Sequence, residues 1–89
     1  MERRIFRRIK VDAEITLNNK YGIYNGVLDN ISMGGLFART RKRISMVAGD
    51  TTEIIIQFPV GTRKDSIVIN GMVTRVNRNG VAFKFLDIK

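Results

Sequence analysis

Cysteine and histidine are both absent from this 89-residue chain. Without cysteine there can be no disulfide framework and no thiolate metal site. Without histidine the chain lacks the commonest general base and the commonest metal ligand. A single proline and a hydrophobic content of 44% indicate a globular chain, and no apolar run approaches the ~20 residues that span a membrane. We therefore expect one cytoplasmic domain with no membrane span.

Acidic residues are scarce, since eight Asp and Glu stand against sixteen Lys and Arg, a net charge of +8. This balance points to an anionic partner: nucleic acid, a nucleotide, or an acidic membrane or protein surface. A basic surface with no such partner is the plain alternative. The acidic residues are scattered, Ser32 has no histidine to activate it, and Gly34-Gly35 is not followed by the Lys-Ser/Thr of a phosphate-binding loop. We expect a non-enzymatic protein with no cofactor and no metal.

Six short stretches have the composition or the alternating pattern of β-strands, with turn residues between them. They span residues 11–17, 21–28, 35–40, 52–58, 66–76 and 81–85. No segment shows a helical period, and the regular spacing is typical of an all-β sandwich or barrel. Six strands in so small a domain favour a closed or nearly closed barrel, because closure removes exposed strand edges.

Several details of these strands follow from single residues. Pro59 is expected to end the fourth stretch, with a loop over residues 60–65, and Gly71 is expected to mark a bend or bulge. Asn79-Gly80 predicts a tight hairpin with positive φ angles. One face of the first stretch is predicted to be buried, and it consists of Val11, Ala13, Ile15 and Leu17.

The turn over residues 29–37 carries more directed polar groups than a hairpin requires. Asn30 and Ser32 are short side chains that hydrogen-bond nearby backbone. Gly34 and Gly35 are expected to supply positive φ and to let another group approach the main chain closely. We predict that this turn forms part of a binding site.

The first ten residues contain four arginines, which repel one another. We expect residues 1–10 to be a flexible ligand-binding segment and residues 11–89 to be a single barrel domain. A guanidinium can pair with phosphate, fork onto guanine O6 and N7, or stack on a base. The arginine segment and the turn are therefore predicted to hold one small anionic ligand. A solvated basic tail beside an ordinary turn is the alternative.

These two stretches resemble the two motifs of the PilZ domain family, in the family's order. Residues 4–8 resemble its R-x-x-x-R element, with Arg3 as the arginine often seen before it, and residues 30–35 resemble its D/N-x-S-x-x-G element. Residues 80–85 are similar to the glycine-led strand that closes the PilZ barrel. The chain departs from the commonest pattern at Asn30, where a neutral amide stands in place of a carboxylate.

The resemblance implies a six-stranded antiparallel β-barrel of the split-barrel type with little or no helix. It also implies that the ligand is the bacterial second messenger cyclic di-GMP. Two arginines would contact guanine and phosphate, a third would assist, and three turn residues would line the guanine site. The arginines that contact guanine and phosphate would be Arg4 and Arg8, and the assisting arginine would be Arg3. The turn residues that line the guanine site would be Asn30, Ser32 and Gly35.

The hypothesis for the mechanism is an order–disorder switch, in which the ligand neutralises the arginines and folds their segment against the barrel, changing contact with a downstream protein. Two alternatives stay open. One is a PilZ-like interaction module without ligand binding. The other is a small nucleic-acid-binding barrel that uses residues 39–43, which is disfavoured because Phe58, Phe83 and Phe85 are assigned to the core and not to stacking.

Overall fold

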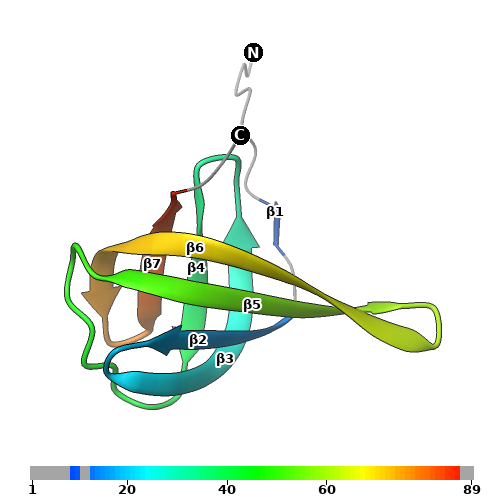
Figure 1. The fold of residues 1–89 in the computed structure, drawn as a ribbon, viewed down its shortest axis with the longest axis horizontal. Helices are drawn as coiled ribbons and strands as arrows, with labels where there is room; N and C mark the ends of the chain where they lie inside the picture. Colours follow the sequence, from blue (N-terminus) through cyan, green and yellow to red (C-terminus); the bar gives the residue numbers. More distant parts are fainter. Residues whose placement is uncertain (1–8, 11–12, 87–89) are drawn as a thin grey trace.

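The computed structural model describes the backbone of residues 9–10 and the whole of residues 13–86 (Figure 1). The described chain folds into strands joined by turns and irregular segments, without a helix. The strands are β1 Ile9–Lys10, β2 Glu14–Asn19, β3 Gly22–Ile31, β4 Gly35–Thr40, β5 Thr51–Val60, β6 Arg63–Asn77 and β7 Gly80–Phe85. Consequently no helix of this part of the chain is long and apolar enough to cross a membrane.

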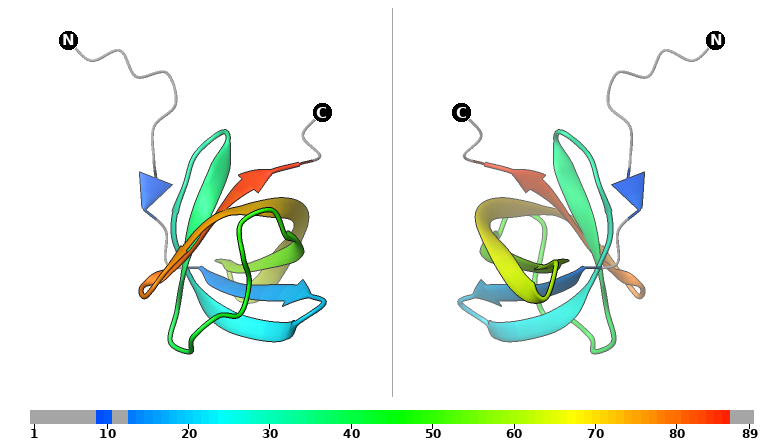
Figure 2. Two further views of the ribbon diagram at one scale, coloured as in Figure 1. Left: turned by 90° about the vertical axis from the view of Figure 1, so that its left-hand side faces the viewer. Right: turned by 90° about the vertical axis from the view of Figure 1, so that its right-hand side faces the viewer.

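Six strands close into an antiparallel barrel. The order around the ring is β3-β2-β5-β6-β7-β4, and the pairing of β3 with β4 completes it (Figure 2). The six strands of the ring are those expected from the sequence, and the closed all-β barrel is confirmed. The short strand β1 lies outside the ring and pairs with the end of β3.

The core follows from the alternation along the strands. The most completely buried large side chains come from β2, β5, β6 and β7: Ile15, Leu17, Ile54, Val73 and Val81. The predicted inner face of the first strand is confirmed for Ala13, Ile15 and Leu17, while Val11 lies outside the described residues. In β2 these core positions alternate with the polar residues Glu14, Thr16 and Asn18, which face the outer surface of the barrel.

A long hairpin of β5 and β6 projects from the barrel (Figure 1, right). The prediction that Pro59 ends the strand and that residues 60–65 form a loop is wrong. Pro59 pairs with Lys64 within the ladder, and only residues 61 and 62 form the turn. The pairing of β5 with β2 stops at Gln57, so Pro59 occupies an edge position, where proline is tolerated.

Two β-bulges interrupt the ladders, and neither lies at Gly71. One lies between Leu28 and Asn30, and the other between Val73 and Arg75. Gly71 stays in register with both neighbouring strands, and a Cβ there would lie 2.7 Å from Cδ1 of Ile54. The small residue therefore accommodates the packing of Ile54.

The β6–β7 hairpin forms where predicted, but without the predicted positive φ. Among the described residues only Gly22, Gly49 and Gly61 have positive φ. The side chain of Asn77 closes the turn, because its Oδ1 accepts hydrogen bonds from the amides of residues 79 (2.8 Å) and 80 (3.1 Å). An Asx turn thus replaces the expected Asn-Gly geometry.

Candidate functional site

The turn between β3 and β4 is held by backbone hydrogen bonds. The Ser32 amide donates to the Gly35 carbonyl at 2.9 Å, and the Ser32 hydroxyl lies 3.4 Å from the same oxygen. The Phe85 amide donates to the Gly34 carbonyl at 2.9 Å, which ties the turn to the end of β7. These hydrogen bonds thus hold Ser32, Gly34 and Gly35 in place relative to the end of β7.

The expected positive φ at Gly34 and Gly35 is wrong, but a close approach is present at Gly35. A Cβ on Gly35 would collide with the carbonyl oxygen of Phe83 in β7, whereas a Cβ on Gly34 would meet nothing within 4 Å. Gly35 is thus required because β4 and β7 lie close together at this point. The requirement is one of packing and not of backbone conformation.

The bulge in β3 turns two successive polar side chains to the outer surface. Leu28 and Ile31 both pack inward, and normal alternation would place only one residue outward between such neighbours. Here both Asp29 and Asn30 face outward. The Asn30 amide nitrogen donates to Oδ2 of Asp29 at 3.3 Å, and Oδ1 of Asp29 lies 3.3 Å from Nε of Arg39. Asp29 thereby places a carboxylate next to Asn30, the position at which the commonest form of the motif has one.

The predicted turn residues Asn30, Ser32 and Gly35 line one cavity of about 360 Å³ on the outer face of the barrel. The bulge in β6 contributes to the same cavity, because it turns both Thr74 and Arg75 outward between the inward residues Val73 and Val76. Both bulges of the barrel therefore add polar side chains to this cavity.

The cavity also has lining residues that were not predicted from the sequence, among them Phe37, Arg75 and Lys84. Lys84 pairs with Gly35 in the β4–β7 ladder, so its outward position follows from the alternation of β7. Arg75 and Lys84 are exposed, and neither is within ion-pair distance of an acidic side chain in the described part of the chain. The site thus contains two unneutralised cations beside a half-buried aromatic ring.

Strand β1 joins the N-terminal part of the chain to this site. Ile9 pairs with Ile31, and Lys10 pairs with Asn30. The residue after Arg8 in the sequence is therefore anchored beside the turn. Arg3, Arg4 and Arg8 themselves lie outside the described residues, so their contacts stay a prediction. Across residues 9–10 and 13–86, no three acidic, histidine or cysteine side chains gather closely enough to hold a metal ion.

Comparison with known proteins identifies the family. The sequence profile of the PilZ domain matches residues 2–89. The chain belongs to the PilZ domain family. PilZ domains are a family of cyclic di-GMP receptors, and the family predicted from the sequence is confirmed. Among curated protein sequences, none matches the chain significantly.

Two solved PilZ structures share the fold. Inhibitor of motility (MotI/DgrA) from Bacillus subtilis superposes with a TM-score of 0.78 at 18% identity, covering 100% of this chain and 44% of that protein. The PilZ domain of CeSA from a cellulose-synthesizing bacterium superposes with a TM-score of 0.65 at 19% identity, covering 92% of this chain and 83% of that one. The chain thus spans less than half the length of MotI, and at these identities the likeness shows the fold alone.

Proposed function

We propose that this PilZ domain is a non-enzymatic receptor for cyclic di-GMP, which binds in the cavity over β3, β4, β6 and β7 together with the N-terminal arginines. One observation supports this above all. The turn residues Asn30 and Ser32 share a cavity with Arg75 and Lys84, and β1 anchors the chain that follows Arg8 at its edge.

The chemistry of the cavity suits this ligand. Guanine presents N–H donors on one edge and the O6 and N7 acceptors on another. The amide oxygen of Asn30 and the hydroxyl of Ser32 offer acceptors in the cavity, and the carboxylate of Asp29 lies beside Asn30. Arg75 and Lys84 offer positive charge to the phosphodiesters, and the half-buried ring of Phe37 offers a surface for a base.

The N-terminal arginines complete the site in this proposal. Arg4 and Arg8 contact guanine and phosphate, Arg3 assists, and neutralisation of their charges orders the arginine segment that precedes β1 against the barrel. The new surface then alters contact with a downstream protein. Differential contact of the ligand with the ordered segment is what makes this a switch.

The binding test is calorimetric titration of cyclic di-GMP into the wild type, Arg8→Ala and Arg7→Ala, with GTP as the control ligand. Arg7 lies inside the R-x-x-x-R element but not at one of its two arginine positions, so it is a control matched in charge and place. Loss of a charge-assisted contact worth about 1.5–3 kcal/mol should weaken binding by about tenfold or more in Arg8→Ala and much less in Arg7→Ala.

Equal losses in the two variants would show that only the total charge of the segment matters. No binding heat in the wild type would favour the interaction module without ligand, and Asn30→Asp would then be the first substitution to titrate. The switch has a separate test, in which amide hydrogen exchange of residues 3–8, which precede β1, should slow when cyclic di-GMP is added. Unchanged exchange in a protein that does bind the ligand would refute the ordering step and leave the binding site intact.

A further inference from the structure

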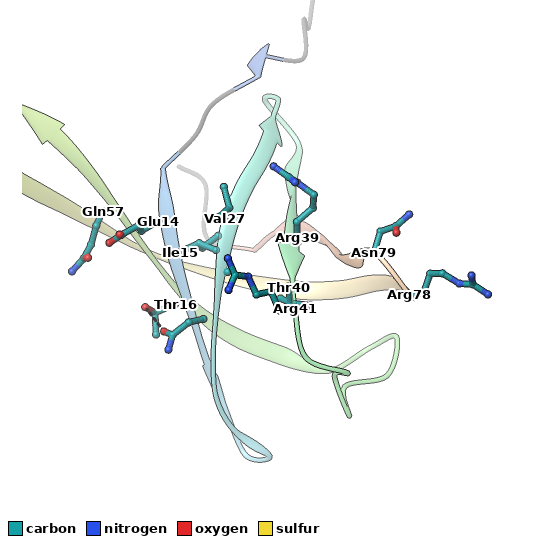
Figure 3. A pocket seen from close by; sticks show the side chains of 12 residues that line it. Glu14, Ile15, Thr16, Val27, Arg39, Thr40, Arg41, Gln57, Arg78 and Asn79 are labelled. Atoms are coloured by element: carbon teal, nitrogen blue, oxygen red, sulfur yellow. Dashed lines mark hydrogen bonds between the residues drawn. The ribbon is translucent and has the colours of Figure 1, made fainter.

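A second cavity of about 770 Å³ lies on the outer face of β2, β3 and β4, toward the end of β4 that is remote from the turn at Gly35 (Figure 3). Three arginines line one part of it: Arg39 and Arg41 from β4 and the loop that follows, and Arg78 from the β6–β7 hairpin. Glu14 and Gln57 line the opposite part, as Figure 3 shows. We call this cavity the basic groove.

The charge of the basic groove is largely unneutralised. Arg41 and Arg78 also line an adjoining hollow together with Lys42 and Arg43, so five cations gather at this end of the barrel. Arg39 pairs with Asp29 and keeps 53% of its side chain exposed, and within residues 13–86 the other four have no acidic partner. Exposed cations clustered around a hollow raise the local concentration of anionic groups and guide their approach.

The two ends of the basic groove differ in charge, with arginines at one end and Glu14 at the other. The Glu14 carboxylate lies at the end remote from Arg78, where it makes a long ion pair of 3.7 Å with Lys64 of β6. Because both side chains are well exposed, 69% for Glu14, the pair is weak and leaves the carboxylate open to other contacts. Between the two ends, Thr16 and Asn25 present neutral hydrogen-bonding groups, and the Thr16 hydroxyl lies 3.3 Å from Oδ1 of Asn25. A partner that fits this pattern carries acidic groups at one end and neutral or basic groups at the other.

This pattern separates the possible anionic partners. A phosphate backbone that follows the groove would bring its charge against Glu14, and no aromatic side chain lines the groove to stack on bases. A flat membrane surface does not enter a hollow. Arginine predominates over lysine among the cations, and its planar fork suits carboxylates as well as phosphates, so Glu14 and the lack of aromatic side chains are what favour a carboxylate-bearing partner.

We propose that the basic groove binds an extended, acidic segment of a partner protein, with its carboxylates against Arg39, Arg41 and Arg78. The neutral part of the segment lies across β3 and β2 and ends near Glu14. This surface is separate from the cavity at Asn30, and it gives the domain a place for a partner that no sequence motif marks. The carboxylate of Asp29, which contacts both Asn30 and Arg39, lies between the two sites.

The test uses a fluorescein-labelled peptide with a run of glutamates, a serine spacer and a terminal lysine, measured by fluorescence anisotropy in the absence of cyclic di-GMP. The comparison probes are the same peptide with every glutamate replaced by glutamine, an oligothymidylate of similar length, and vesicles containing phosphatidylserine. The protein is compared with Arg41→Ala/Arg78→Ala and with the control Lys20→Ala/Arg63→Ala. The control removes the same charge from two exposed positions outside the groove, Lys20 in the turn between β2 and β3 and Arg63 at the start of β6.

We expect saturable binding of the acidic peptide, about tenfold weaker in Arg41→Ala/Arg78→Ala and nearly unchanged in the control. Glu14→Lys should also weaken binding of the acidic peptide, because the terminal lysine of the peptide would then meet the positive charge of the new lysine. Absence of saturable binding, or equal losses in the two double variants, would overturn the proposal. Tighter binding of oligothymidylate or vesicles through the same arginines would also overturn it, in favour of that partner. Since no cyclic di-GMP is present, none of these outcomes bears on the ligand site.

Discussion

Alanine at Gly35 and alanine at Gly34 are expected to have opposite effects on stability, although the two residues are adjacent. At Gly35 the new Cβ would collide with the Phe83 carbonyl oxygen, which belongs to the β4–β7 ladder. A backbone atom cannot move aside as a flexible side chain can, so the two strands must separate. At Gly34 the residue is exposed, its φ is not positive, and a Cβ meets nothing within 4 Å.

The magnitudes follow from these two environments. Overpacking costs about 1–3 kcal/mol, and a collision with backbone places Gly35→Ala at the upper part of that range. Gly34→Ala should stabilise the fold by about 0.4–1 kcal/mol, because alanine lowers the conformational entropy of the unfolded chain. The 89-residue chain has an unfolding entropy of roughly 190 cal/mol/K at about 2.1 cal/mol/K per residue, so 1 kcal/mol shifts Tm by about 5 °C.

Thermal and urea unfolding, followed by circular dichroism, measure both variants directly. Gly35→Ala should lose about 10 °C or more in Tm, while Gly34→Ala should gain a few degrees. A Tm for Gly35→Ala within the error of the wild type would refute the steric argument at Phe83. A similar loss in both variants would show instead that the turn needs the conformational freedom of glycine.

Three other changes test separate parts of the structure. Arg75→Ala should weaken cyclic di-GMP binding by about tenfold, whereas Arg63→Ala, on the distant hairpin, should leave binding unchanged in the same titration. Equal effects of the two substitutions would show that Arg75 does not contact the ligand. Leu17→Ala should destabilise the barrel by about 2–5 kcal/mol in urea unfolding, because Leu17 is fully buried, and a loss below about 1 kcal/mol would contradict the described core. Asn30→Asp should lower stability by about 0.5 kcal/mol, because its carboxylate would face that of Asp29, and adding Asp29→Asn should restore it; no recovery in the double variant would show that the two side chains do not interact.

The sequence determined the fold class and most of the strands of this PilZ domain. Alternation along a strand records which side chains face the core, so the inner face of β2 and the bounds of β4 could be read directly. The two motifs carried the family, because they combine residue types and spacing that few other turns share. The length of the β5–β6 hairpin was not predictable in the same way, because Pro59 is compatible with a strand only if its edge is free, and that depends on where β2 stops.

In the candidate site, some residues could be predicted from a local motif and others only from the pairing of distant strands. Asn30, Ser32 and Gly35 are close together in the sequence, so a local motif identifies them and the turn brings them to one cavity. Arg75 and Lys84 reach that cavity from β6 and β7 through the register of distant strands, which no local pattern contains.

Two bulges decide which polar side chains face the ligand site. Each leaves a trace in the sequence, namely two polar residues between inward-facing apolar ones, Asp29-Asn30 and Thr74-Arg75. That trace indicates an extra residue, but it does not say which neighbouring strand the residue opposes. Local sequence therefore determined the strands, the turn and the motif residues. Only the closed barrel decided which residues from separate strands meet, because their contacts depend on pairing across the ring.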